Sequence, residues 1–190
     1  MKKTRNTCLV LAVAVILITL ISAPTLAYYT VIGKATNVVT SGDISLAIHE
    51  KTADGADFPA EGVTVLPGDV VGKRVTVENV CAHPFYLRVQ LYNPATKQVL
   101  SVSDCMQVDL NTNDWTVGAD GFIYYNTVLQ PGQTTQPVFT QVHIVGEKVT
   151  RENIGDTLQL TVNAYAVQSE NNPAEHPWDA AGWPETGGNV

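Results

Sequence analysis

Basic residues are scarce in this chain. It has 11 Lys and Arg against 18 Asp and Glu, and its formal net charge is −7 over 190 residues. A protein that binds nucleic acid through the phosphates needs a stripe or patch of Lys and Arg. The sequence offers no such patch, so we predict that nucleic acid is not a partner.

Motifs typical of enzymes are also missing. A common zinc peptidase carries His-Glu-x-x-His on a helix, which places two imidazoles on one face with the Glu as base. Here His49-Glu50 is followed by Lys51-Thr52-Ala53, so no His stands at the second ligand position, and no Gly-x-Ser-x-Gly elbow occurs. The four histidines are scattered: His49, His83, His143 and His176. We predict no enzymatic activity, no catalytic residue, no cofactor and no bound metal.

Hydrophobic runs long enough to span a membrane are absent as well. The apolar run from Cys8 to Ile21 has about 14 residues, whereas a membrane-spanning helix needs roughly 20. Three basic residues precede this run, and Thr25-Leu26-Ala27 follows it with small residues for a signal peptidase. This pattern predicts a signal peptide over 1–27, cut between Ala27 and Tyr28. The protein is then secreted and meets the membrane only during export; an uncleaved anchor is the alternative.

Cysteine is rare too, since processing leaves only Cys81 and Cys105. An exported chain can oxidise such a pair. The bond would close a loop of roughly 25 residues, for which the chain-entropy model gives about 3 kcal/mol. We expect a Cys81–Cys105 disulfide; two independent buried thiols are the alternative.

The mature chain has the size of one domain. About 163 residues remain after cleavage, with a net charge near −10 that suits solubility outside the cell. We divide them into an extended N-terminal segment (28–41), a β domain (42–170) and a Pro/Gly-rich tail (171–190). The tail should be flexible apart from docking by Trp178 or Trp183.

Alternation with a period of two recurs along the mature chain, which predicts half-buried β-strands. Shorter strands are predicted at Met106 to Leu110 and Phe122 to Tyr125, and one helical turn within Glu147 to Gly155. The residues that share one face of each longer strand are Ile44, Leu46 and Ile48; Val75 and Val77; Phe85, Leu87, Val89 and Leu91; Val138, Thr140, Val142 and Ile144; and Leu158, Leu160, Val162, Ala164 and Ala166.

These strands predict an all-β fold. Seven or eight strands separated by turn signals, with no helix of useful length, indicate a two-sheet antiparallel β-sandwich, because each one-sided sheet needs another sheet to cover it. Two Pro-Gly turns, Pro67-Gly68 and Pro131-Gly132, each precede a long alternating strand. Their similarity raises the odds of equivalent corners in two packed sheets.

Four stretches, in this order, resemble the TasA/camelysin family of exported proteins, whose precursors are cut by a SipW-type signal peptidase. They are the processing region Ala27-Tyr28-Tyr29-Thr30, the opening of the first strand over Thr40 to Leu46, the turn and strands from Leu66-Pro67-Gly68-Asp69 to Tyr86-Leu87-Arg88-Val89, and the closing strand Val162 to Asn172. Cys81 and the stretch from Lys97 to Asp120 depart from the family's pattern.

The resemblance implies a jelly-roll-like subunit of an extracellular fibre in a biofilm matrix, a homo-oligomer in which the N-terminal segment of one subunit adds as a strand to the next. This chain suits that role physically, because Tyr28 to Val39 is rich in residues with high β-propensity and cleavage after Ala27 releases one end of it. Such a strand can pair with an exposed sheet edge of a neighbour, and the contact can propagate. The expected assembly residues are Tyr28, Tyr29, Thr30, Val31, Ile32, Val38 and Val39. The alternative is that this segment pairs within its own domain.

Two other functions stay open. A monomeric cell-surface binding or adhesion module would use outward aromatic rings such as Tyr86 and Tyr92, unless these rings fill a core instead. Camelysin-like relatives have been classed as metallopeptidases, a function that the missing zinc motif argues against.

Overall fold

The computed structural model describes residues 29–37, 44–93, 98–99, 105–148 and 157–184. Within these ranges the chain is all-β, as predicted, and its helical content is limited to short 3-10 turns. The strands are β1 (Tyr29–Asn37), β2 (Leu46–Lys51), β3 (Val63–Val65), β4 (Val70–Gly72), β5 (Arg74–Asn79), β6 (Phe85–Asn93), β7 (Gln98–Val99), β8 (Met106–Val108), β9 (Trp115–Val117), β10 (Ile123–Tyr125), β11 (Gln141–Ile144) and β12 (Thr157–Gln168). The turns are η1 (Gly146–Lys148) and η3 (Pro177–Asp179).

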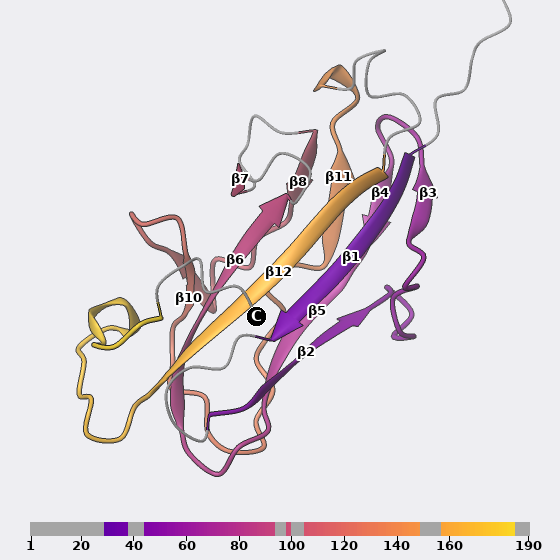
Figure 1. The fold of residues 1–190 in the computed structure, drawn as a ribbon. Helices are drawn as coiled ribbons and strands as arrows, with labels where there is room; N and C mark the ends of the chain where they lie inside the picture. Colours follow the sequence, from indigo (N-terminus) through magenta and orange to yellow (C-terminus); the bar gives the residue numbers. More distant parts are fainter. Residues whose placement is uncertain (1–28, 38–43, 94–97, 100–104, 149–156, 185–190) are drawn as a thin grey trace, which may run out of the picture.

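One layer of the fold is a seven-stranded sheet. Its order is β3-β1-β12-β6-β10-β9, with β7 paired to β6. The long strands β1, β12 and β6 run side by side in Figure 1. β12 and β6 pair antiparallel from Thr161↔Tyr92 to Gln168↔Phe85, which makes them the centre of the sheet.

The other layer combines two smaller sheets, β4-β11-β8 and β2-β5. β4 and β5 are separated only by Lys73, whose N–H donates to the Thr140 carbonyl at 2.9 Å. The N–H of Val75 donates to the Phe139 carbonyl at 3.3 Å. These bonds continue the pairing of β4 with β11, so the two small sheets act as one layer facing the seven-stranded sheet.

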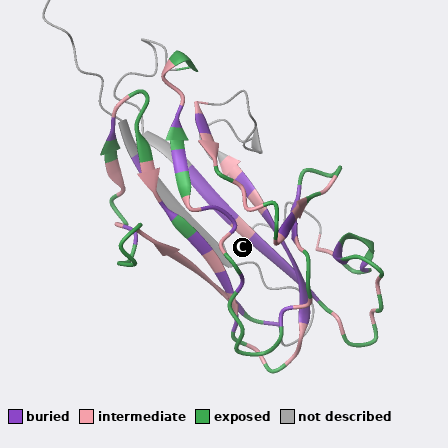
Figure 2. Cartoon of the chain, turned by 180° about the vertical axis from the view of Figure 1, so that it is seen from behind, coloured by how far each residue is buried: buried purple, intermediate pink, exposed green. Residues whose placement is uncertain are grey.

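The core lies between the two layers, and the predicted faces supply it. A single buried cluster contains Val77 from β5, Val142 from β11, Leu87 from β6 and Val162 from β12, all fully buried. Buried positions alternate with more exposed ones along β5 and β11, whereas β6 and β12 are buried on both faces (Figure 2). Removing this apolar surface from water stabilises the sandwich by roughly 25 cal/mol for each Å².

Some local predictions differ from the structure. The run that begins at Val138 forms a strand only from Gln141 onward, because Val138 and Phe139 are both fully buried and the alternation breaks there. No strand is predicted at the positions of β3, β4 and β9, whereas β8 and β10, which are equally short, fall within predicted strands. A 3-10 turn, η1, spans Gly146–Lys148 at the start of the stretch expected to be helical, and the rest of that stretch, 149–155, lies outside the described residues.

The pairing of β1 with β12 is parallel, which departs from the predicted antiparallel pattern. Antiparallel neighbours are usually joined by a short turn, whereas parallel neighbours need a long connection. Almost the whole domain lies between β1 and β12 in the sequence. No turn therefore fixes their relative direction, and sequence periodicity carries no information about it.

Residues 171–184 of the tail fold back over the seven-stranded sheet, where Trp178 and Trp183 both dock against Tyr124. Asn171 adopts a left-handed backbone with φ of 58°, which turns the chain after β12. Ala180 is buried against Tyr86 and Val167. The outward face of β6 and β12 is therefore covered by the chain itself.

Candidate functional site

The expected assembly segment forms β1, which lies inside the seven-stranded sheet between β12 and β3. Its register with β12 runs in parallel from Thr30↔Thr157 to Asn37↔Ala164. Its register with β3 is antiparallel, from Tyr29↔Val65 to Val31↔Val63. In this single chain the segment thus pairs within its own domain.

Val31 anchors β1 in the core. Its side chain is fully buried and belongs to the cluster that also holds Val65 and Leu160. Three other expected assembly residues, Tyr29, Thr30 and Ile32, also belong to β1. The cleavage residues Ala27 and Tyr28, with Val38 and Val39, lie outside the described residues.

The position of β1 creates a slot in the sheet. A strand between β12 and β3 receives main-chain hydrogen bonds from both sides, and these bonds do not depend on which chain supplies the strand. The connection from β1 to β2 passes through residues 38–43, which are outside the described part. We call the space between β12 and β3 the β1 slot.

A second built feature is a cage of aromatic rings around Arg88 on the outward face of β6. The guanidinium carbon lies 3.7 Å from the ring centroid of Phe122, 4.7 Å from that of Trp183 and 5.6 Å from that of Tyr165. Only 7% of Arg88 is exposed. A guanidinium over ring faces is attracted by their negative quadrupoles, more strongly when water is excluded.

Hydrogen bonds complete the cage. Arg88 donates to the Tyr124 hydroxyl at 3.2 Å and to the Pro184 carbonyl at 2.9 Å. The Tyr124 hydroxyl donates to Asp120 at 2.6 Å, and the Asp120 carboxylate lies 3.6 Å from the guanidinium. Burial raises the pKa of Tyr124, and the hydrogen bond to Asp120 raises it further, while Arg88 opposes both.

Residues 171–184, which we call the strap, close this cage. Asn172 fixes the strap's loop: its amide donates to the Ala181 carbonyl at 2.9 Å, and its amide oxygen accepts from the Ala181 N–H at 3.1 Å. Trp183 packs edge-on against Tyr124 with ring centroids 5.6 Å apart. The sequence predicts docking by Trp183; it does not predict the meeting of Trp183 with Arg88, because the two residues are far apart in the chain.

The aromatic residues expected on an adhesion surface are mostly covered. Tyr86 is 7% exposed, Tyr124 is 2% exposed and Trp115 is 1% exposed, while Tyr92 and Tyr125 are half-buried. Tyr86 lies under the strap, beside Ala180. The rings therefore fill a core, and the interpretation of Tyr86 as an exposed binding residue is wrong.

The expected disulfide is not formed: Cys81 and Cys105 are both thiols. The Cys81 thiol donates to the Asn79 amide oxygen at 3.1 Å and lies 3.3 Å from the His83 carbonyl, in the loop before β6. Cys105 lies at the start of β8, where its carbonyl accepts the N–H of Val145. Both residues are partly buried against the main hydrophobic cluster.

His49 and Glu50, which in the sequence match the first half of a zinc motif, each contact a different partner. His49 lies 2.8 Å from Glu78 on the neighbouring strand. Glu50 lies 2.8 Å from Lys73, whose side chain is fully buried and whose ammonium lies 4.5 Å from the ring centroid of Phe58. Among the described residues, no group of three or more His, Cys, Asp and Glu side chains is placed to hold a metal ion.

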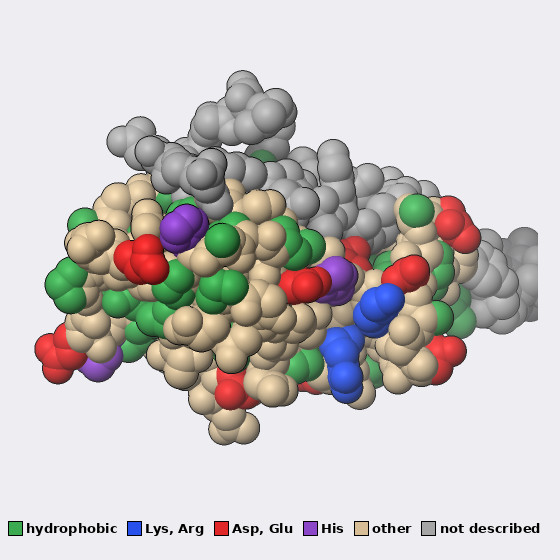
Figure 3. All heavy atoms as spheres, turned by 90° about the horizontal axis from the view of Figure 1, so that it is seen from below, with side chains coloured by type: hydrophobic (Ala, Val, Ile, Leu, Met, Phe, Trp, Pro, Cys, Tyr) green, Lys and Arg blue, Asp and Glu red, His purple; other side chains and the backbone are tan. Residues whose placement is uncertain are grey.

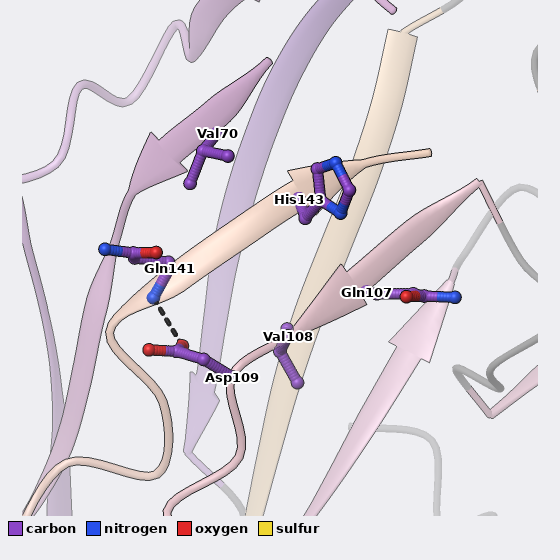
Figure 4. A pocket seen from close by; sticks show the side chains of 6 residues that line it. All are labelled: Val70, Gln107, Val108, Asp109, Gln141 and His143. Atoms are coloured by element: carbon purple, nitrogen blue, oxygen red, sulfur yellow. Dashed lines mark hydrogen bonds between the residues drawn. The ribbon is translucent and has the colours of Figure 1, made fainter. Parts of the chain in front are cut away.

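A hollow of about 320 Å³ lies on the outer face of β4, β11 and β8 (Figure 4). It is lined by Val70, Gln107, Val108, Asp109, Gln141 and His143. Burial opposes ionisation of Asp109, but hydrogen bonds from Thr140 and Gln141 outweigh it and hold the pKa of that carboxyl below its usual value. The Asp109 carboxylate already accepts hydrogen bonds from both residues, so it stabilises the chain that leads into β11.

Charges of both signs are mixed on the surface seen in Figure 3, where basic side chains lie beside acidic ones. Lys51, for example, pairs with Asp57 at 2.5 Å. Within the described ranges, no helix has the length and apolar character that crossing a bilayer would require.

Comparisons of the chain with models of known families, with curated proteins and with solved structures find no match.

Proposed function

We propose that this chain is an exported structural subunit of an extracellular fibre or biofilm matrix, and that copies join by exchanging β1. The proposal includes membership of the TasA/camelysin family, cleavage after Ala27 by a SipW-type signal peptidase, and an all-β sandwich as the repeating unit. The observation that carries it is the place of β1 between β12 and β3.

Exchange of β1 between copies is plausible on energetic grounds. A neighbour's β1 in the β1 slot would make the same main-chain hydrogen bonds to β12 and β3, and its Val31 would enter the same core position. Exchange of identical elements costs little, because the strand makes the same interactions in a neighbour as in its own chain. Since the donor strand and the slot are different surfaces, successive exchanges give an open filament.

The direct experiment compares two proteins, one beginning at Tyr28 and one beginning at Gly42. We expect filaments from the longer protein only, measured by size-exclusion chromatography and electron microscopy. Addition of a synthetic 28–41 peptide to the shorter protein should fill its β1 slot and raise its melting temperature. Identical monomers from both proteins would contradict the proposal and favour a monomeric surface module.

A disulfide can test exchange without removing β1. Thr30 and Thr64 are directly opposite in the antiparallel pairing of β1 with β3, where Cα atoms are about 4.5–5.5 Å apart, a separation that a disulfide can bridge. Thr30→Cys with Thr64→Cys should hold β1 in its own domain when oxidised and block filaments, and reduction should restore them. Filaments from the fully oxidised protein would exclude exchange at this slot.

A pair of charge substitutions supplies a matched control. Val31→Asp places a carboxylate where the side chain is fully buried, so β1 should no longer seat in either its own or a neighbour's slot. Val80→Asp adds the same charge at a position that is 50% exposed. We expect the first variant to lose filaments and the second to keep them.

A further inference from the structure

We infer that the outward face of β6, β10 and β12 is a peptide-docking site for a Trp-Pro segment, filled in one chain by its own strap and open, when that strap lifts, to the strap of a second copy. This inference concerns the opposite end of the chain from β1 and does not depend on fibre formation through β1.

The chemistry of the face is that of a site that binds a peptide with a large aromatic ring and a free main-chain carbonyl. Grooves lined by aromatic rings are a recurring means of peptide recognition. Here Phe122, Tyr124 and Tyr165 supply rings, and Arg88 donates to a main-chain carbonyl, that of Pro184, at 2.9 Å. Trp183 places its ring 4.7 Å from the Arg88 guanidinium. These interactions would be the same for any copy of the segment.

The strap is attached at few points. Pro177 and Ala180 are buried and Trp183 is half-buried, whereas Glu175, His176, Asp179 and Ala181 are exposed. Trp178 is 39% exposed; it stacks on His176 with ring centroids 4.5 Å apart and meets the Tyr124 ring edge-on at 6.2 Å. A segment with few buried side chains opens locally more readily than the domain unfolds.

If the strap lifts, it exposes apolar side chains of the sheet that are buried beneath it. Tyr86 and Val167 form one buried cluster with Ala180, and Phe122, Tyr124 and Tyr165 form another beside Trp183. Exposed apolar patches of this kind mark interaction sites. The strap itself is complementary to this surface and is carried by every copy, so the occupant in trans is a second copy.

Concentration decides between the two arrangements. A tethered segment competes at an effective concentration in the millimolar range. A dilute chain should therefore keep its own strap, and exchange should occur only where copies are crowded or where the strap is weakened. Added peptide should bind the wild-type chain weakly, because the form of that chain in which its own strap is lifted is rarely populated.

The test uses a fluorescent peptide of residues 177–184 and the full chain carrying Trp183→Ala, whose own strap has lost its ring. By fluorescence anisotropy we expect this variant to bind the peptide at least tenfold more tightly than the wild-type chain does. The control is Val70→Ala, which removes an exposed apolar side chain from the opposite layer and leaves the strap intact, and which should bind like wild type. A Trp183→Ala peptide should bind the Trp183→Ala chain at least tenfold more weakly than the natural peptide.

Two results would overturn the inference: no binding of the natural peptide to a folded Trp183→Ala chain, or equal binding of the natural and Trp183→Ala peptides. If the variant does not fold, the wild-type chain is titrated with excess peptide instead, and the Arg88 Nε–H signal is followed by NMR. A saturable shift of that signal with the natural peptide alone supports the docking site, and an unchanged signal overturns it.

Discussion

Among the described residues, Lys73 and Arg88 are buried cations that lie in opposite layers and are stabilised in different ways. Lys73 is fully buried and meets one carboxylate, that of Glu50, and the face of Phe58. Arg88 is surrounded by rings and donates to neutral oxygens, with Asp120 farther away at 3.6 Å. One is a buried ion pair between neighbouring strands; the other joins the strap to the sheet.

The difference follows from the chemistry of the two side chains. Arg carries a planar, delocalised charge that stacks on rings and spreads its donors over several acceptors, whereas Lys is a compact charge that changes its pKa when buried. Burial lowers the pKa of Lys73, and Glu50 partly offsets this. Loss of Lys73 should therefore affect the whole domain, and loss of Arg88 mainly the strap.

The largest effect is expected from Lys73→Ala. The substitution leaves the Glu50 carboxylate, whose side chain is 12% exposed, without its partner. Breaking a buried pair costs about 3–5 kcal/mol, to be measured as the loss of unfolding free energy in urea. The double variant Lys73→Met with Glu50→Leu should recover most of that loss, because no charge stays unpaired. A cost for Lys73→Ala no greater than for Arg74→Ala, at the exposed neighbouring position, would contradict the prediction.

Arg88→Met should cost less, about 2–3 kcal/mol, because the cation–π attraction is removed and the acceptor oxygens lose their donor. Its distinctive result is release of the strap, seen as faster hydrogen exchange of the Trp183 indole in the native state. Arg88→Lys should not restore protection, because an ammonium cannot reproduce the planar fork. Lys73→Ala serves as the control, since its native state should keep the Trp183 indole protected. Equal exchange in all variants would show that Arg88 does not hold the strap.

Asn171→Ala should cost about 1 kcal/mol, because the left-handed backbone at φ of 58° disfavours a Cβ that lacks a local polar group. Asn171→Gly is the control and should be close to neutral, since glycine adopts this conformation readily. Thermal unfolding of both variants measures the difference. Equal destabilisation by Ala and Gly would mean that the side chain of Asn171, rather than its backbone, shapes the turn.

The smallest effect is the response to alkaline pH, which should have opposite sign in the two regions. Burial raises the pKa of Tyr165 and of Tyr124, so the folded chain holds these protons more tightly, and their contribution to stability is lost as pH rises from about 10 through the raised values. The lowered pKa of Lys73 has the opposite effect. Between this lowered pKa and the usual one, the unfolded chain binds more protons at Lys73 than the folded chain does, so the free energy of unfolding rises with pH. Tyr165→Phe should flatten the decline of unfolding free energy above pH 10, and an unchanged slope would contradict this.

The predicted faces of β5, β6 and β12 are confirmed, because alternation along a strand directly reports which side meets a core. The same alternation correctly assigns Arg88 to the outward face of β6, yet that face is buried too. Its cover comes from residues 171–184, which have no periodicity to reveal where they dock. The role of Lys73 escapes sequence analysis for a similar reason: its partner Glu50 is on another strand, and a lone Lys in a sequence is most often a surface residue.

The sequence by itself determined the all-β class, the inward faces of the long strands, the acidic balance and the high β-propensity of the segment that becomes β1, because composition and periodicity are local properties. Only the tertiary structure decided that β1 lies parallel to β12, that Glu50 pairs with Lys73, and that Trp183 meets Arg88. Each of these contacts joins residues distant in the chain, and such contacts are selected by the packing of the whole domain rather than by any local pattern.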